Sequence, residues 1–185
     1  MRLFIASTFP EDVLRELNER VARLKPRLPA ASWVRPEAQH LTFAFLGEQP
    51  ESLIDTLTAR LEPALAAIPR FETRLHASGF FPNPRRARVG WVGVEPEQAY
   101  ASIATAVRET VQACGVTLDG AAFKAHLTLM RIRDQWPPAS TELFTQSLRD
   151  YASQPFVLEK VTLFSSQLNP KGAIHTALRT FGLAG

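Results

Sequence analysis

The sequence predicts an α+β protein of two pseudo-symmetric lobes, each a small, mainly antiparallel sheet backed by helices, with a central groove between them. Three observations predict this fold. The tetrapeptide His40-Leu41-Thr42-Phe43 recurs 86 residues later as His126-Leu127-Thr128-Leu129. At the same shift Pro10-Glu11 corresponds to Pro96-Glu97, and each pair opens a run with apolar residues at helical spacing. The other strand-like and helix-like stretches also follow one another in the same order in both halves.

The elements of the first half follow from the spacing of apolar residues. We expect a strand at Arg2–Ser7, then a helix whose apolar positions are Val13, Leu14, Leu17, Val21 and Leu24. Proline suits the first turn of a helix because its missing N–H would have no partner there, and glutamate complements the positive helix end. The strand that carries the first tetrapeptide comes next, followed by a helix over Ser52–Ala66 and an extended run over Phe71–Phe81.

The second half repeats this order. We expect a strand at Val89–Val94, a helix over Thr141–Ala152, an extended run at Phe156–Ser166 and a last strand at Ala173–Leu183. The first helix of this half has its apolar positions at Tyr100, Ile103, Ala104, Val107 and Val111. We therefore expect one bilobal domain over residues 1–185, with repeat units of approximately 2–87 and 88–173 and a final strand at 174–183. Any α/β protein alternates helices and strands, but the shared order, spacing and tetrapeptide favour a repeat.

Composition is that of a globular protein. Hydrophobic residues make up 45% and charged residues 21%, which argues against disordered and fibrous classes. The net charge of +3 suits a polyanionic partner, but many enzymes are equally basic. The single cysteine, Cys114, excludes an internal disulfide and a multi-cysteine zinc site. No signal-peptide core or membrane-spanning stretch is visible, so we expect a cytoplasmic monomer with no membrane partner.

Strand geometry indicates what the two tetrapeptides offer. Successive side chains alternate between faces, so His40 and Thr42 share one face, and His126 and Thr128 share a face in the other half. If the halves face each other across a groove, the two imidazole–hydroxyl pairs approach from opposite sides. The opposite, helix-covered faces are expected to consist of Leu41, Phe43, Phe45, Leu127 and Leu129.

This set of groups suits phosphodiester chemistry. A neutral imidazole can take a proton from water while a protonated one gives a proton to the leaving oxygen, and both forms coexist near neutral pH. Hydroxyl groups can donate hydrogen bonds to the phosphate oxygens on which charge develops. A lone histidine in an apolar strand is more often a core residue, but the repeated context favours a functional pair.

A metal centre fits the sequence less well. There is no third histidine close to the pair and no His-Glu-x-x-His helix, and the nearest carboxylates are Glu37, Glu48 and Asp134. This is a poor zinc-ligand set. We therefore expect neither a metal nor a cofactor.

The two His-x-Thr-x segments resemble the motifs of the 2H phosphoesterases. The chain is most similar to the RNA 2′,3′-cyclic phosphodiesterases, also called 2′-5′ RNA ligases, and the similarity covers nearly its whole length. It includes the flanking segments Arg2-Leu3-Phe4-Ile5-Ala6, Trp33-Val34-Arg35-Pro36, Phe43-Ala44-Phe45-Leu46-Gly47, Gly79-Phe80-Phe81-Pro82 and Arg88-Val89-Gly90-Trp91-Val92-Gly93-Val94. One His-x-Thr is unspecific, but two of them with these flanks form a strong signal.

The resemblance implies a bilobal fold and hydrolysis of the 2′,3′-cyclic phosphate at an RNA end, or in a cyclic nucleotide, to a 2′-phosphate. It implies that His40 is the proton donor to the leaving 3′ oxygen and that His126 is the proton acceptor that activates water. Symmetry alone does not distinguish these two roles. Thr42 and Thr128 are then expected to bind the phosphate.

The chain departs from the family pattern in one place, and a further residue depends on local geometry. Relatives often have a tyrosine near Ile174-His175-Thr176, so the role of that aromatic is open here. Arg131 matches a basic residue that often follows the second motif, and it is a candidate substrate-binding residue. It lies five residues after His126, so a regular strand directs it to the opposite face, and it reaches the phosphate only if the strand ends or bulges first.

Several other residues have both a structural and a functional interpretation. His76 and His175 are expected mainly in solvent, with a smaller chance that His175 lines the groove. A basic run can be a solvated loop or an RNA-backbone contact, and aromatic residues can be core or can stack on a base. The residues concerned are Arg85, Arg86 and Arg88 in the basic run, and Phe80, Phe81 and Trp33 among the aromatics.

Three alternatives to RNA-end hydrolysis stay open. The first is the joining of 2′-5′ RNA ends. The second is a phosphodiesterase for small cyclic nucleotides, and the third is a catalytically idle module that binds RNA ends. The intact His and Thr at all four motif positions argue against the idle module, because binding alone does not need two titratable groups.

Overall fold

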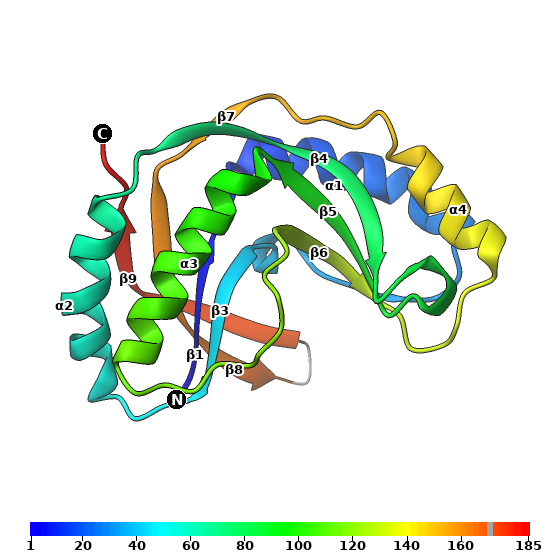
Figure 1. Ribbon diagram of the computed structural model, residues 1–185. Helices are drawn as coiled ribbons and strands as arrows, with labels where there is room; N and C mark the ends of the chain where they lie inside the picture. The colour runs from blue at the N-terminus through cyan, green and yellow to red at the C-terminus, as the bar shows by residue number, and fades with distance from the viewer. Residues whose placement is uncertain (170–171) are drawn as a thin grey trace.

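Two antiparallel sheets form the body of the protein, and helices lie on their outer sides (Figure 1). The computed structural model describes residues 1–169 and 172–185. The first sheet has the order β3 (Leu41–Glu48), β1 (Arg2–Ser7), β8 (Lys160–Asn169) and β9 (Gly172–Gly182). The second has the order β2 (Ser32–Trp33), β6 (His126–Arg131), β5 (Val89–Glu95), β4 (Phe71–Phe81) and β7 (Phe156–Leu158). The predicted α+β class with two helix-backed antiparallel sheets is confirmed.

The helices bury the apolar positions that their periodicity predicts. They are α1 (Glu11–Leu24), α2 (Leu53–Ala66), α3 (Glu97–Ala113) and α4 (Pro138–Ser147), with short 3-10 turns at Lys25–Arg27, Pro36–Ala38 and Pro84–Arg86. In α3, for example, Tyr100, Ile103 and Val107 are fully buried. Figure 1 shows α2 and α3 side by side against the first sheet, and α1 and α4 on the side of the second. No helix among the described residues is long and apolar enough to cross a membrane.

The two sheets are not each built from one repeat unit. Strand β4 closes the first half of the chain, yet it pairs with β5 of the second half. Strand β8 of the second half pairs in the equivalent way with β1 of the first. Each half therefore contributes two strands and two helices locally and sends its third strand into the other sheet. The expectation that each contiguous half forms its own lobe is wrong in this respect.

Two of the predicted elements have different bounds. The helix expected at Thr141–Ala152 spans Pro138–Ser147, because proline is favoured in the first helical turn and the chain then leaves the helix at Leu148. Leu148 and Tyr151 are buried beyond the helix end. The extended run expected at Phe156–Ser166 is two strands, β7 and β8, which pair with β4 and β1 respectively and separate at Glu159.

Candidate active site

The two His-x-Thr segments lie where the sheets meet. Strand β3 is the outer strand of the first sheet, and β6 lies beside the two-residue β2 at the side of the second. These two strands contact each other. His40 directly precedes β3 and His126 begins β6, so the equivalent motifs come together from opposite halves of the chain.

Both imidazoles are held by the same hydrogen bond. Nδ1 of His40 lies 2.8 Å from the carbonyl oxygen of Ala38, and Nδ1 of His126 lies 2.6 Å from that of Lys124. A carbonyl oxygen can only accept, so in each neutral ring Nδ1 carries the hydrogen and Nε2 carries the lone pair. The backbone two residues before each histidine thus fixes the tautomer and leaves Nε2 for a ligand.

Aromatic rings border the histidines. The ring of Phe4 lies 4.9 Å from that of His40, and Phe81 lies 4.8 Å from His126 with its ring edge-on. The His175 ring is 5.2 Å from His40, and its buried Nδ1 has no hydrogen-bond partner among the described residues. His175 therefore lines the site rather than standing in solvent.

Each motif contains a β-bulge at its fourth residue. In the first sheet Ala6 pairs with Thr42 and Ile5 pairs with Ala44, so Phe43 is an extra residue. In the second, Trp91 pairs with Thr128 and Gly90 pairs with Met130, so Leu129 is the extra residue. Phe43 and Leu129 are both buried and are equivalent under the shift of 86. A bulge reverses the alternation of the side chains that follow it.

The second bulge brings Arg131 to the face of the motif. Arg131 pairs with Val89, which lies two residues from Trp91 and shares its face, and Trp91 pairs with Thr128. Arg131 and Thr128 therefore lie on one face, which a regular strand does not allow for residues three apart. The positive charge of Arg131 lowers the pKa of both His40 and His126, so it lies within electrostatic reach of both.

The first bulge does the same for Phe45, which is the equivalent of Arg131 in the other half. Phe45 pairs with Phe4, two residues from Ala6, and Ala6 pairs with Thr42. Phe45 consequently shares a face with Thr42, and 62% of it is exposed. The prediction that Phe45 belongs to the apolar face is wrong, because strict alternation does not continue through the bulge.

The surroundings of the two imidazoles favour their neutral forms. Burial lowers the pKa of His40 to about 4, and the charges of His175, His126 and Arg131 act in the same direction, against the hydrogen bond to Ala38. Burial also lowers the pKa of His126, with smaller effects from Arg131 and Lys124. The site is a concentration of positive or potentially positive groups, which is an arrangement suited to an anion.

The motif threonines have no protein partner. Neither the Thr42 nor the Thr128 hydroxyl forms a hydrogen bond within residues 1–169 and 172–185, and both residues are half-buried. Both hydroxyls are therefore free to bind a ligand. No group of three or more His, Cys, Asp or Glu side chains in the described part of the chain is placed to hold a metal ion.

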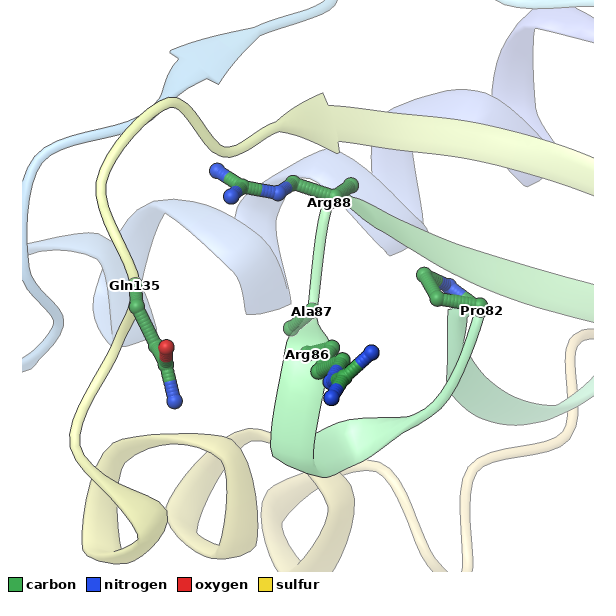
Figure 2. Close-up of a pocket in the computed structure, with 5 residues that line it drawn as sticks. All are labelled: Pro82, Arg86, Ala87, Arg88 and Gln135. Carbon is green, nitrogen blue, oxygen red and sulfur yellow. The ribbon is translucent and has the colours of Figure 1, made fainter.

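The basic run lies at a pocket of its own. This pocket, of about 360 Å³, is lined by Pro82, Arg86, Ala87, Arg88 and Gln135, and Figure 2 shows the turn with Arg86 opposite the loop with Gln135. Gln135 donates a hydrogen bond to the Arg85 carbonyl oxygen. The pocket lies beyond the ends of β5 and β6 and contains neither histidine.

The remaining candidates have structural contacts. Phe80 is buried against Phe144, with ring centroids 5.0 Å apart. The ring of Trp33 is half-buried under Nζ of Lys25, 5.0 Å from its centroid. His76 contacts the Tyr151 carbonyl oxygen through Nδ1 at 3.2 Å. Cys114 is a free cysteine at the end of α3.

The family model of the 2′-5′ RNA ligase superfamily matches residues 10–170. The chain belongs to this superfamily. The resemblance of its two motifs to those of the 2H phosphoesterases is thereby confirmed. An RNA 2′,3′-cyclic phosphodiesterase of Archaeoglobus fulgidus is 34% identical, over 98% of this chain and 99% of its own. One from Thermus thermophilus is 33% identical, over 100% and 91% of the two chains.

Solved structures of the superfamily show the same fold. The crystal structure of TT0787 from Thermus thermophilus has a TM-score of 0.80 and 29% identity, and covers 100% of this chain and 99% of its own. The structure of E. coli LigT complexed with 3′-AMP has a TM-score of 0.77 at 22% identity, with 100% and 98% of the chains covered. The superfamily fold thus extends over the whole chain.

Proposed function

We propose that this protein hydrolyses the 2′,3′-cyclic phosphate at an RNA 3′ end and leaves a 2′-phosphate and a 3′-hydroxyl. Full-length similarity to RNA 2′,3′-cyclic phosphodiesterases supports the general activity. The pair of equivalent histidines supports the mechanism. It is the single observation that carries the proposal, because hydrolysis needs one group to take a proton and another to give one.

Each histidine has one task in the proposed reaction. Nε2 of neutral His126 accepts a proton from water as the water oxygen attacks phosphorus. The bond between phosphorus and the 3′ oxygen breaks, and protonated His40 gives its Nε2 proton to that oxygen. Proton balance is kept, since one enters at His126 and one leaves from His40. The hydrogen bonds to Ala38 and Lys124 hold the two Nδ1 atoms and keep both Nε2 atoms available.

The threonines and Arg131 bind the phosphate in this proposal. The Thr42 and Thr128 hydroxyls donate to its two non-bridging oxygens, where negative charge accumulates in the transition state. Arg131 neutralises that charge from the face it shares with Thr128. All chemical steps are supplied by side chains of this chain, with no metal.

The anionic substrate also supplies the protonated His40 that the reaction requires. Before substrate binds, burial and neighbouring positive charges hold the pKa of His40 at about 4. A bound phosphate places a negative charge beside the imidazole and offsets these effects, and a close opposite charge typically moves a pKa by about 1–3 units. The acid is thus charged mainly when substrate is present.

An RNA oligonucleotide that ends in a 2′,3′-cyclic phosphate tests the proposal. We expect hydrolysis to a 2′-phosphate, in the presence of EDTA, and a loss of at least ~10²-fold in turnover for His40→Ala and for His126→Ala. Both variants should bind the product as the wild type does and remain folded. Binding of RNA ends without turnover by the wild type would indicate the idle module instead, and loss of activity in EDTA would indicate a metal.

A further inference from the structure

We propose that Phe45 is the stacking surface for the nucleobase of the terminal nucleotide and thereby fixes the direction in which the substrate enters. This inference rests on the proposed function. It concerns a residue to which neither the histidine chemistry nor phosphate binding gives a role.

The position of Phe45 follows from the bulged strand. The bulge at Phe43 and a second irregularity beside Leu46 bring Phe45 opposite Phe4, on the face that carries Thr42. The ring of Phe4 lies between, 6.1 Å from Phe45 and 4.9 Å from His40. A base on Phe45 is therefore one aromatic ring away from the imidazole, and the ribose of the same nucleotide can span that interval.

Phe45 is also exposed in an unusual way for its type. The large hydrophobic residues with high exposure in the described chain are Met1, Phe45, Val157, Leu168 and Ile174, and Phe45 alone among them is aromatic. One side of its ring is supported by Phe4, which is 3% exposed and packed on Phe164 at 5.1 Å. A rigid aromatic with one open face is the usual support for an unpaired base, since every base has a π face.

Stacking at Phe45 removes the symmetry of the site. The two motifs are equivalent, but the residues that their bulges bring to the groove face differ, Phe45 in one half and Arg131 in the other. The apolar base is held beside His40, and the phosphate charge is held by Arg131. The nucleoside, which carries the leaving 3′ oxygen, then lies on the His40 side and water approaches from the His126 side.

The test compares substrates with and without a base. For adenosine 2′,3′-cyclic phosphate, Phe45→Ala should raise KM by about 5- to 150-fold, the range found when an aromatic under a base is removed. The kcat should change little, because the stack is made equally in the ground and transition states. For methyl riboside 2′,3′-cyclic phosphate, which has no base, KM should equal that of the wild type. Phe45→Trp should retain wild-type KM for both.

Matched variants and a binding measurement separate the outcomes. Val157→Ala removes a comparably exposed apolar side chain elsewhere and should change neither substrate's KM. An equal rise for both substrates in Phe45→Ala, or none for either, would overturn the inference. The Kd values of adenosine 2′-phosphate and of methyl riboside 2′-phosphate give the same comparison without turnover. Selective loss of adenosine 2′-phosphate binding in a wild-type background that hydrolyses nothing would reject the proposed function and retain the stacking site.

Discussion

At the scale of single residues, the site consists of ordinary side chains in a restrictive setting. His40 and His126 each give up one ring nitrogen to a carbonyl oxygen two residues earlier in the chain. Because that bond fixes the tautomer, the remaining nitrogen is the only one that a ligand can use. Burial and neighbouring positive charge then hold the pKa of both rings low until an anion arrives.

The lowered pKa of His40 predicts a stability that depends on pH. The unfolded chain binds this proton near pH 6.5 and the folded one only near pH 4, so the free energy of unfolding falls as pH drops through that interval. The effect of His40 alone is about 3 kcal/mol at most. In urea denaturation from pH 7 to pH 4, His40→Asn should lose stability less steeply than the wild type. Parallel profiles for the two proteins would contradict the lowered pKa.

The motif threonines predict a selective kinetic defect. Thr42→Val and Thr128→Val keep the shape of the side chain and remove a donor to the phosphate, and loss of one such donor costs up to ~3–4 kcal/mol in the transition state. We expect kcat to fall by about 10²–10³-fold for each variant, with a smaller change in product affinity. Steady-state kinetics on a cyclic mononucleotide measure this, and unchanged kcat in both variants rejects phosphate binding by the hydroxyls.

The sequence predicts these residues unequally. The histidines and threonines are visible because the tetrapeptide occurs twice. Arg131 and Phe45 are assigned to the wrong face by strict alternation, since a bulge adds one residue without changing the amino-acid pattern. His175 is close to His40 only because β9 pairs with β8, a contact that no local pattern indicates.

At the scale of elements, strand β4 prepares the wall beside His126. Gly79 lies opposite Trp91, and a Cβ at Gly79 would be 2.5 Å from the Trp91 ring. The indole therefore lies directly on the backbone of β4, and Phe81 packs against it at 5.3 Å. Phe81 in turn contacts His126. A glycine in one strand thus makes room for the aromatic support of the second histidine.

Gly79→Ala should consequently disturb both stability and turnover. Overpacking a filled site typically costs about 1–3 kcal/mol, and the displaced indole should move Phe81 and lower kcat. Gly120→Ala is the matched control, because no atom lies within 4 Å of its added Cβ. Thermal denaturation and kinetics should show the change for Gly79→Ala alone. Wild-type values for that variant would mean that Trp91 repacks freely.

Element order is predictable from the sequence for most of the chain, and sheet membership is not. Helical spacing locates α1, α2 and α3 to within a few residues, and the shift of 86 pairs the elements of the two halves. Which strands pair is a long-range property. The apolar pattern of β4 is equally compatible with either sheet, so strand exchange between the halves leaves no local signal.

At the scale of the whole molecule, strand exchange joins the halves into one unit. The first sheet contains β8 and β9 from the second half, and the second sheet contains β4 from the first. Neither half can complete its own sheet. Both histidines are therefore placed by contacts that only the entire chain provides.

This topology predicts a single cooperative unfolding transition. In urea, near-UV and far-UV circular dichroism should give one coincident midpoint for the full chain. Fragments 1–87 and 88–185 should each be largely unfolded alone, because their third strands lack partners. Two separate transitions, or a fragment with a cooperative transition of its own, would show that the halves fold independently.

The central claim is that His40 gives a proton to the 3′ oxygen and His126 takes one from water. The most direct test is a substrate whose 3′ oxygen is replaced by sulfur, because a thiolate departs without protonation. With this substrate, His40→Ala should recover most of the rate that it loses on the natural cyclic phosphate, and His126→Ala should stay slow. Recovery by His126→Ala in place of His40→Ala would exchange the two roles, and recovery by neither would contradict the division of acid and base between the two motifs.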